Sequence, residues 1–281
     1  MSDAAANAAQ IENWNLRTGE IWVRFQPRLD AQISPLGEQA MTALAPAAGE
    51  RVLDIGCGCG QTSVNLATRV APGGAVLGVD VSEPMLGLAR SRPRPAGAAP
   101  LDFRRADAQV EDLGAGAFDA VFSRFGVMFF ADPSAAFANI RAALRPGGRL
   151  SFVCWRAMAL NPMMTAPLEA ARALLPPLPP ADPLAPGPFA FADAARVRGI
   201  LGAAGFTDIV ISPFDADLVG GTLEEAVELS LFVGPLATVL RDNPQLREPV
   251  TNAVRETWRA RLKDGVVVIP AAVWIVTATN A

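Results

Sequence analysis

The fold is decided by residues 50–60, which read ERVLDIGCGCG. Val52, Leu53 and Ile55 are strand formers in a short apolar run. The next stretch, QTSVNLA over 61–67, suits a helix. Glycine permits a sharp turn between the two because it has no Cβ to clash with the chain or with a ligand. The helix N-terminus offers free N–H groups and a partial positive charge, so this strand–turn–helix unit predicts a nucleotide-binding site.

Six further apolar runs continue this alternation of strand and helix along the chain. Turn residues and helical stretches separate the first runs, which is typical of parallel strands covered by helices. Such sheets bind their ligands at the carboxyl ends of the strands. We therefore predict an α/β fold with a Rossmann-like, seven-stranded, mostly parallel sheet and helices on both faces. The expected strands cover residues 51–55, 75–79, 101–105, 118–122, 149–154, 207–211 and 266–277.

Three parts are expected along the chain. Residues 1–47 suit an N-terminal helical cap, in which Ser34 and Pro35 predict the start of a second helix because proline fits the first helical position. Residues 48–156 form the expected ligand-binding core. Residues 157–281 are expected to add an insertion, the last strands of the sheet and a helical lid.

The third part is marked by proline and by a helix-start signal. Nine of the 24 prolines lie between residues 161 and 188, which predicts an extended insertion over 156–192. Thr222 and Glu225 form a capping box, in which each side chain satisfies a backbone N–H at the start of a helix. We expect this helix to open a lid over 222–262, because long insertions in compact domains are often binding loops or lids.

Composition narrows the classes of function. The net charge is -4 and the isoelectric point is about 5.0, with no basic run, so nucleic acid is not expected as a partner. No apolar run reaches about 18 residues, so no membrane span is predicted. The first ten residues lack the features of a signal peptide, and a cytoplasmic location is expected. A small-molecule substrate fits these observations, and a homodimer stays open.

Cysteine and histidine content limits the chemistry further. Cys57, Cys59 and Cys154 do not make a disulfide framework, and we interpret them as small buried side chains and expect no metal. The chain has no histidine to complete a mixed thiolate–imidazole metal site. The same absence excludes a Ser-His-Asp system and an imidazole base, and tyrosine is missing as well.

Two aspartates follow predicted strands at the edge where a ligand would bind. Asp80 lies about 20 residues after Gly60, where a carboxylate can accept hydrogen bonds from a ribose diol. Asp107 follows the third strand and can accept from an adenine amine, with the Ala108 N–H nearby. The alternatives are an exposed loop aspartate for Asp80 and a helix cap for Asp107.

A glycine turn and a strand-two acid are shared by nicotinamide and S-adenosylmethionine enzymes. Gly56, Gly58 and Gly60 do not follow the G-x-G-x-x-G spacing of a dinucleotide site. Asp54 precedes them, at a point where a cofactor amine can approach. The residues thus favour S-adenosylmethionine over a nicotinamide cofactor.

Five motifs, in order, resemble those of class I S-adenosylmethionine-dependent methyltransferases. The branch they resemble most is related to the ubiquinone/menaquinone-biosynthesis methyltransferases, over residues 48–155. The resemblance implies methyl transfer to a small molecule by in-line displacement, here without a histidine base. The motifs are VLDIGCGCG (52–60), GVDVSEPM (78–85), ADA (106–108), FDAVFS (118–123) and LRPGGRL (144–150).

The resemblance also implies a set of cofactor-binding residues. The glycines would contact the methionine part, Asp54 its amine, Asp80 the ribose, and Asp107 with Ala108 the adenine edge. Val81 and Met85 would flank the adenine. The full set is Asp54, Gly56, Cys57, Gly58, Gly60, Asp80, Val81, Met85, Asp107, Ala108, Ser123, Arg124 and Phe125, the last three beside the sulfonium and the substrate entrance.

No catalytic residue is predicted, and several roles stay open. Glu169, Asp182, Asp215 and Asp217 are candidates for a carboxylate base, although each also suits a solvated surface acid. Competing functions are a nicotinamide-dependent oxidoreductase and a non-catalytic protein that binds S-adenosylmethionine.

Each of four apolar residues has two candidate roles, in packing or in the pocket. Trp14 and Trp22 either pack the N-terminal segment onto the sheet or close the cofactor pocket, and packing is preferred. Core packing is likewise the preferred reading for Met128 and Phe129.

Overall fold

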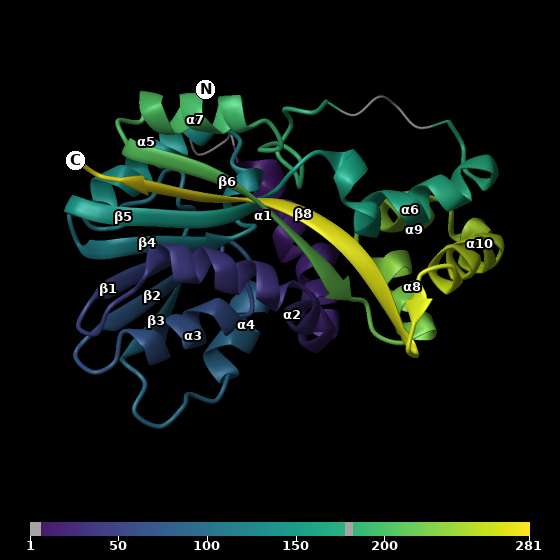
Figure 1. The fold of residues 1–281 in the computed structure, drawn as a ribbon, viewed down its shortest axis with the longest axis horizontal. Coiled ribbons are helices and arrows are strands. Elements are labelled where there is room, and N and C mark those ends of the chain that lie inside the picture. The colour runs from purple at the N-terminus through teal and green to yellow at the C-terminus, as the bar shows by residue number, and fades with distance from the viewer. Residues whose placement is uncertain (1–6, 178–181) are drawn as a thin grey trace.

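The computed structural model describes residues 7–177 and 182–281. The start of the predicted cap, residues 1–6, and a stretch inside the predicted insertion, residues 178–181, lie outside the described residues. One sheet forms the centre, with strand order β3-β2-β1-β4-β5-β8-β6 and a short β7 beside β8 (Figure 1). The strands are β1 (Arg51–Ile55), β2 (Ala75–Asp80), β3 (Leu101–Arg105), β4 (Phe118–Arg124), β5 (Leu144–Trp155), β6 (Thr207–Val219), β7 (Leu262–Lys263) and β8 (Val266–Thr279).

The first five strands pair in parallel, and β8 runs antiparallel between β5 and β6. This confirms the predicted α/β class with a mostly parallel sheet. The helices are α1 (Ala8–Asn15), α2 (Arg17–Leu44), α3 (Gln61–Arg69), α4 (Glu83–Ser91), α5 (Pro133–Ala143), α6 (Pro162–Ala171), α7 (Ala194–Ala203), α8 (Leu223–Phe232), α9 (Pro235–Asp242) and α10 (Arg247–Arg259), with short 3₁₀ turns η2 (Val127–Phe129), η3 (Met158–Leu160), η4 (Arg172–Leu174) and η5 (Pro244–Leu246).

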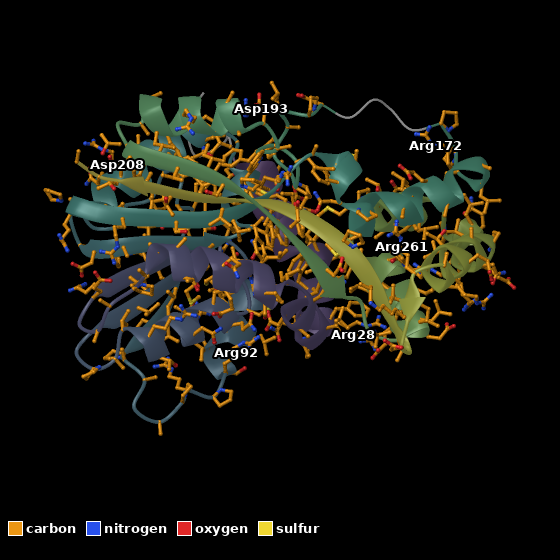
Figure 2. All side chains as sticks on the ribbon, viewed as in Figure 1. Arg28, Arg92, Arg172, Asp193, Asp208 and Arg261 are labelled. Carbon is orange, nitrogen blue, oxygen red and sulfur yellow. The ribbon has the colours of Figure 1, made fainter. Side chains whose placement is uncertain are left out.

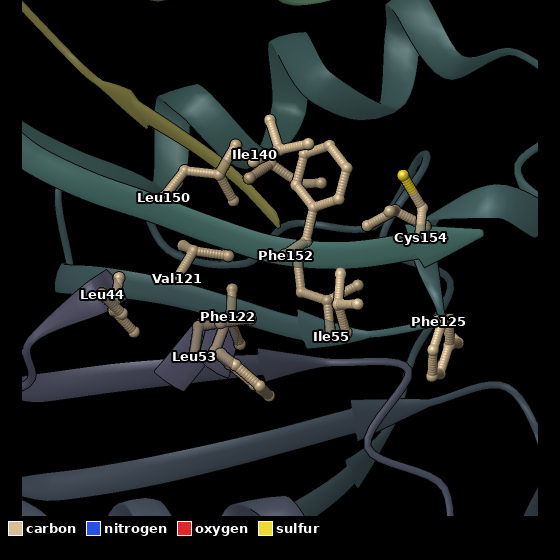
Figure 3. Close-up of a cluster of buried hydrophobic side chains, with 14 of the residues drawn as sticks. Leu44, Leu53, Ile55, Val121, Phe122, Phe125, Ile140, Leu150, Phe152 and Cys154 are labelled. Carbon is tan, nitrogen blue, oxygen red and sulfur yellow. The ribbon is translucent and has the colours of Figure 1, made fainter. Parts of the chain in front are cut away.

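Helices cover the sheet on both faces. Leu150 and Phe152 of β5 point toward Ile140 of α5 (Figure 3). Ser151, between them, points the other way and donates a hydrogen bond to the carbonyl of Ala40 on α2 at 2.8 Å. This alternation follows from the period of two residues along a strand, and it explains why the central strands are apolar almost throughout.

The prediction of a new helix at Ser34 and Pro35 is wrong, because α2 continues through both residues. Ser34 Oγ donates to the carbonyl of Asp30 in the preceding turn rather than capping a new helix. Proline removes one helical hydrogen bond. Buried residues on either side, such as Ile33 and Met41, hold the helix on the sheet across this gap.

The insertion after β5 is more regular than the extended stretch that we expected. It contains the turns η3 and η4 and the helix α6, which begins at Pro162 and passes through Pro167. Pro162 occupies the first turn, where a missing N–H costs nothing. The proline-rich composition therefore masked a helix start.

A second buried cluster lies beyond the carboxyl ends of the strands. The helices α8, α9 and α10 pack there with α6 and with the far end of β8 (Figure 1). Trp258, Leu236 and Val254 are among its buried residues. The predicted capping box at Thr222 is present and begins α8. We call α8–α10 the lid.

The long helix α2 connects the sheet with the lid. It contacts α4 and the strands β5, β6 and β8, so it runs from the sheet toward the lid. Among the described helices, none is long and apolar enough to cross a membrane.

Candidate functional site

A cavity of about 580 Å³ opens where the carboxyl ends of the strands meet the lid. Its walls come from α1, α2, the glycine turn after β1, the ends of β2 and β4, and α8–α10. Ten of the thirteen predicted cofactor residues line it, namely Gly56, Cys57, Gly58, Asp80, Val81, Met85, Asp107, Ala108, Arg124 and Phe125. Most of the predicted cofactor residues therefore lie around one cavity.

The glycine turn brings bare backbone to the cavity. Gly56 and Gly58 have φ values of 64° and 53°, which L-residues with a side chain rarely adopt. A Cβ on Gly56 would lie 2.7 Å from the Cα of Gly126, so the chains after β1 and β4 touch backbone to backbone. The turn can approach a ligand closely for the same reason.

Asp80 ends β2 and holds this turn in place. Its carboxylate accepts hydrogen bonds from the Gly58 N–H at 2.8 Å and from the Ser82 N–H at 2.9 Å. Burial raises the pKa of Asp80 above its ordinary value, and these backbone hydrogen bonds oppose the shift. Asp80 is half-buried at the cavity wall, so its carboxylate can still accept from ligand hydroxyl groups through its remaining lone pairs.

Asp107 lies after β3 at the far side of the same wall. It accepts from the Gln109 N–H at 2.9 Å and from the Asn7 side-chain amide at 3.1 Å. The first bond closes a turn, and no helix begins at Asp107, so the helix-cap alternative does not apply. Asn7 also lines the cavity, and its Oδ1 is buried without a hydrogen-bond partner in the described chain.

Asp54, Gly60 and Ser123 were predicted to bind a cofactor, but they do not line the cavity. Asp54 is fully buried beneath α3, where it accepts from the hydroxyls of Thr62 at 2.7 Å and Ser63 at 2.6 Å. Burial raises the pKa of Asp54 from 3.8 to about 6, against these hydrogen bonds and the charge of Arg124.

The other two residues have backbone roles. Gly60 is the left-handed N-cap of α3, and Ser123 Oγ accepts from the Gly126 N–H at 3.2 Å. Asp54 and Gly60 therefore lie behind the glycine turn, and Ser123 holds the turn after β4.

The three cysteines are buried thiols. Burial raises the pKa of Cys57 well above its ordinary value and that of Cys59 to about 12. Burial raises the pKa of Cys154 as well. A thiol with such a pKa is protonated at neutral pH and is a poor metal ligand. Across residues 7–177 and 182–281 no cluster of three histidine, cysteine or acidic side chains could hold a metal ion.

Aromatic rings surround the part of the cavity next to the turn. Trp14 packs edge-on against Phe129, with ring centroids 5.2 Å apart, and against Trp22 at 6.0 Å. All three rings line the cavity, and Trp22 also packs against the core of the sheet, so Trp22 has both of the roles weighed for it and Trp14 has the pocket role. Phe129 is only half-buried, whereas Met128 is buried as the packing reading expects.

Phe125 follows β4 in a strained conformation. Its φ is 61°, which is uncommon for a residue with a bulky side chain. The ring stacks on Trp155 with centroids 4.3 Å apart and planes 9° from parallel. Such strain persists where the surroundings hold it, and it is often found at functional sites.

Sequence reasoning missed Asp30 of α2. Its carboxylate lines the cavity and pairs with Arg92 at 2.7 Å and with Arg124 at 3.0 Å. Arg92 also donates to the carbonyl of Cys59, so the ion pairs tie α2 to the glycine turn. Asp30 belongs to none of the five sequence motifs. An acid on a helix looks solvated until its neighbours are known.

The candidate bases lie away from the cavity. Glu169, Asp182, Asp215 and Asp217 are all exposed, and none of them lines it. Asp215 forms an ion pair with Arg156 at 2.7 Å. The alternative that these residues are surface acids therefore fits. Among the described residues, the carboxylates that line the cavity are Asp30, Asp80 and Asp107.

The site residues fit a nucleoside ligand in their order along the sheet. Asp107 follows β3, Asp80 ends β2, the glycine turn follows β1, and Phe125 follows β4. These strands are successive neighbours, β3-β2-β1-β4. An elongated ligand can thus place an adenine, a ribose and an amino-acid part at consecutive strand ends, with the bare backbone of Gly58 beside the last.

Comparison with known proteins assigns residues 52–148 to a family described as "Methyltransferase domain". The nocamycin O-methyltransferase of Saccharothrix syringae is 28% identical over 82% of this chain and 75% of its own length. The demethylmenaquinone methyltransferase of Thermus thermophilus is 41% identical over 37% of this chain and 46% of its own length. The chain thus spans about half the length of some curated relatives.

Solved structures share the fold. A Bacillus halodurans protein described as a methyltransferase superposes with a TM-score of 0.55 at 17% identity, covering 86% of this chain and 97% of its own. The phosphoethanolamine N-methyltransferase 2 of Haemonchus contortus, solved with S-adenosylhomocysteine, gives a TM-score of 0.53 at 20% identity, covering 87% of this chain and 52% of its own.

Proposed function

Because residues 52–148 match the methyltransferase-domain family, we propose that the chain transfers a methyl group from S-adenosylmethionine to a small-molecule acceptor. The observation that carries this proposal is the order of the site residues along neighbouring strand ends. A dinucleotide would need a pyrophosphate on the helix after the turn, with another glycine spacing. The relatives that are named as O-methyltransferases support the same reaction class.

The cofactor roles follow from the cavity wall. Asp80 accepts from the ribose hydroxyls, and Asp107 with Ala108 binds the adenine edge between Val81 and Met85. The backbone of Gly56, Cys57 and Gly58 lies along the methionine part. Arg124 and Phe125 lie at the end nearest the acceptor. Asp54, Gly60 and Ser123 act as positioning residues that hold the turn.

When bound, S-adenosylmethionine supplies a methyl group that forms a bond to the acceptor atom as its bond to sulfur breaks, leaving S-adenosylhomocysteine. The chain contributes alignment and exclusion of water, because the aromatic rings and the lid enclose the cavity. No histidine or tyrosine is present to take a proton. The acceptor therefore loses its proton to solvent or arrives with a free lone pair.

The parts of the chain divide this work. We propose that residues 48–156 bind the cofactor, that 1–47 cover it, and that 157–281, with the lid at 222–262, enclose the acceptor. The contacts of α2 support the division. This helix touches β4 and β5 of the cofactor-binding part and β6 and β8 of the third part, so it joins the cofactor wall to the acceptor wall.

Titration calorimetry tests the proposal. The protein is expected to bind S-adenosylmethionine and S-adenosylhomocysteine and to ignore NADH, and binding of NADH alone would refute the assignment. Release of S-adenosylhomocysteine in the presence of an acceptor panel separates an enzyme from a non-catalytic binding protein. Cell fractionation and the mass in solution test the expected cytoplasmic location and the homodimer.

A further inference from the structure

Two glutamines on α2 are buried in the cavity wall, and each has an amide atom without a hydrogen-bond partner among the described residues. Gln26 and Gln32 are 7% and 3% exposed, and both line the cavity. Gln26 Nε2 and Gln32 Oε1 are fully enclosed and have no partner in the part of the chain that the structure describes. An amide buried without partners is costly, so each such group calls for an explanation.

The position of Gln26 points to the acceptor rather than to the cofactor. The neighbours of Gln26 on α2, Phe25 and Leu29, pack against Leu229 of the lid. Gln32 lies two positions after Asp30, which Arg92 ties to the glycine turn, so Gln32 borders the cofactor wall. The predicted cofactor residues come instead from the glycine turn and the ends of β2, β3 and β4.

Charge at the cavity excludes one class of acceptor. Asp30 is neutralised by two arginines, and Asp80 and Asp107 belong to the cofactor wall. Arg241 and Arg247 line the lid side, where Arg241 pairs with Asp242 at 3.4 Å and the described residues give Arg247 no ion pair. The guanidinium of Arg247 lies 5.0 Å from the centroid of the Phe232 ring. A cationic amine would meet repulsion here.

The remaining lid-side wall is mostly apolar, with Ser230 and Thr238 as its hydroxyl-bearing residues. Met163, Leu229 and Ile269 face the cavity together with the ring of Trp258. The indole N–H of Trp258 donates a hydrogen bond to Ser230 Oγ at 2.9 Å, so this donor is not free for a ligand. The cavity wall therefore combines apolar surface with hydrogen-bonding groups of the two glutamine amides that have no protein partner among the described residues.

We propose that Gln26 and Gln32 bind the methyl acceptor, and that the acceptor is an apolar ring or chain carrying neutral hydroxyl or carbonyl groups. An amide offers a donor and an acceptor and can exchange them by rotation, so it suits either oxygen group. This inference rests on the proposed function, because it assigns the lid side of the cavity to the acceptor.

Matched probes test it with the protein saturated by S-adenosylhomocysteine. The probes are 2,7-dihydroxynaphthalene, 2,7-dimethylnaphthalene, which has the same shape without oxygen, and 2-naphthylmethylammonium, which carries a cation. The wild type is expected to bind the dihydroxy probe at least tenfold more tightly than the other two. In Gln26→Leu and Gln32→Leu this preference falls, and in the double variant it vanishes while the dimethyl probe binds as before.

Stability and cofactor affinity complete the test. Both leucine variants are expected to melt at or above the wild-type temperature, because an unpartnered amide is replaced by an apolar group. Gln109→Leu is the matched control, because Gln109 is equally buried but its Oε1 accepts from the Asp132 N–H at 2.9 Å. That variant is expected to melt lower.

The outcomes separate the two proposals. A wild type that binds no S-adenosylhomocysteine refutes the proposed function. Normal binding of S-adenosylhomocysteine with no preference for the dihydroxy probe, with a preference for the ammonium probe, or with no probe bound refutes the inference alone. Loss of S-adenosylhomocysteine affinity in a leucine variant would also overturn it, since that residue would then belong to the cofactor wall.

Discussion

The carboxylate of Asp80 accepts a hydrogen bond from the backbone N–H of Gly58 across 2.8 Å, and the two residues are 22 positions apart in the chain. This bond joins the end of β2 to the turn after β1. The strand-two acid and the glycine turn are therefore one unit, and a ligand that contacts either one depends on both.

Replacement of Asp80 by alanine is expected to weaken S-adenosylmethionine binding by about 1.5–3 kcal/mol, the value of hydrogen bonds to a charged acceptor. Asp80→Asn keeps one acceptor oxygen and is expected to lose less. Calorimetry measures both. Asp102→Ala, on the exposed side of β3, is the control and should bind as the wild type does. Unchanged affinity in the Asp80 variants would remove this residue from the ribose site.

The raised pKa of Asp54 predicts a pH dependence of stability. Its pKa rises from 3.8 in the unfolded chain to about 6 in the fold, so the folded state favours the protonated acid. The resulting stabilisation, about 3 kcal/mol, is complete below pH 4 and is lost as the pH rises through about 6. Urea unfolding at pH 4 and pH 7.5 should show this loss in the wild type but not in Asp54→Asn.

Asp119 serves as a control, because its pKa shift has the opposite sign to that of Asp54. Burial pushes its pKa upward, but hydrogen bonds from the Arg51 N–H and Arg145, with the charges of Arg145 and Arg149, hold the pKa below its ordinary value. Stability from Asp119 is therefore present above its ordinary pKa and is lost as the pH falls. Equal pH slopes in Asp54→Asn and the wild type would show that burial does not perturb Asp54.

A methyl group on Gly126 is expected to disturb the turn. Its Cβ would lie 2.8 Å from the carbonyl oxygen of Ile55 and 2.9 Å from the Cα of Gly56, both backbone atoms that cannot step aside. Gly126→Ala should therefore cost about 1–3 kcal/mol of stability and lower cofactor affinity. Gly87→Ala, in α4 with open space around it, should stabilise by about 0.5–1 kcal/mol. Equal effects of the two changes on melting temperature would contradict the backbone contact.

Loss of the Asp30 carboxylate is expected to leave Arg92 and Arg124 largely buried without their partner. Asp30→Ala should destabilise the protein by about 2–4 kcal/mol, less than for a fully buried pair because some solvent reaches it. Glu228→Ala breaks the exposed pairs of α8 with Arg24 and Arg28 and should cost less than about 1 kcal/mol. Chemical denaturation compares the two, and a larger cost for Glu228 would reverse this ranking.

The central sheet and the glycine turn could be predicted because their signals are local. The segments 51–55 and 101–105 are the strands β1 and β3 with the predicted bounds. Thr222 begins α8 as its capping box indicates. The continuation of α2 through Pro35 could not be predicted in this way, because it depends on packing against the sheet.

The site was predictable only where a motif marks it. Asp80 and Gly58 belong to motifs, and both line the cavity. Asp54 belongs to a motif too, but its side chain lies on the α3 side of β1 and is covered by Thr62 and Ser63. Gln26 looks like an ordinary helix residue until α8 is placed across α2. Long-range packing decides such positions.

The central proposal is that the cavity between the glycine turn and the lid binds S-adenosylmethionine through Asp80. The direct measurement is calorimetric titration of wild type and Asp80→Ala with S-adenosylhomocysteine, with NADH as the competing ligand. We expect one S-adenosylhomocysteine per chain, at least tenfold weaker binding in the variant, and no heat with NADH. Binding of NADH, or equal affinity of both proteins for S-adenosylhomocysteine, would contradict it.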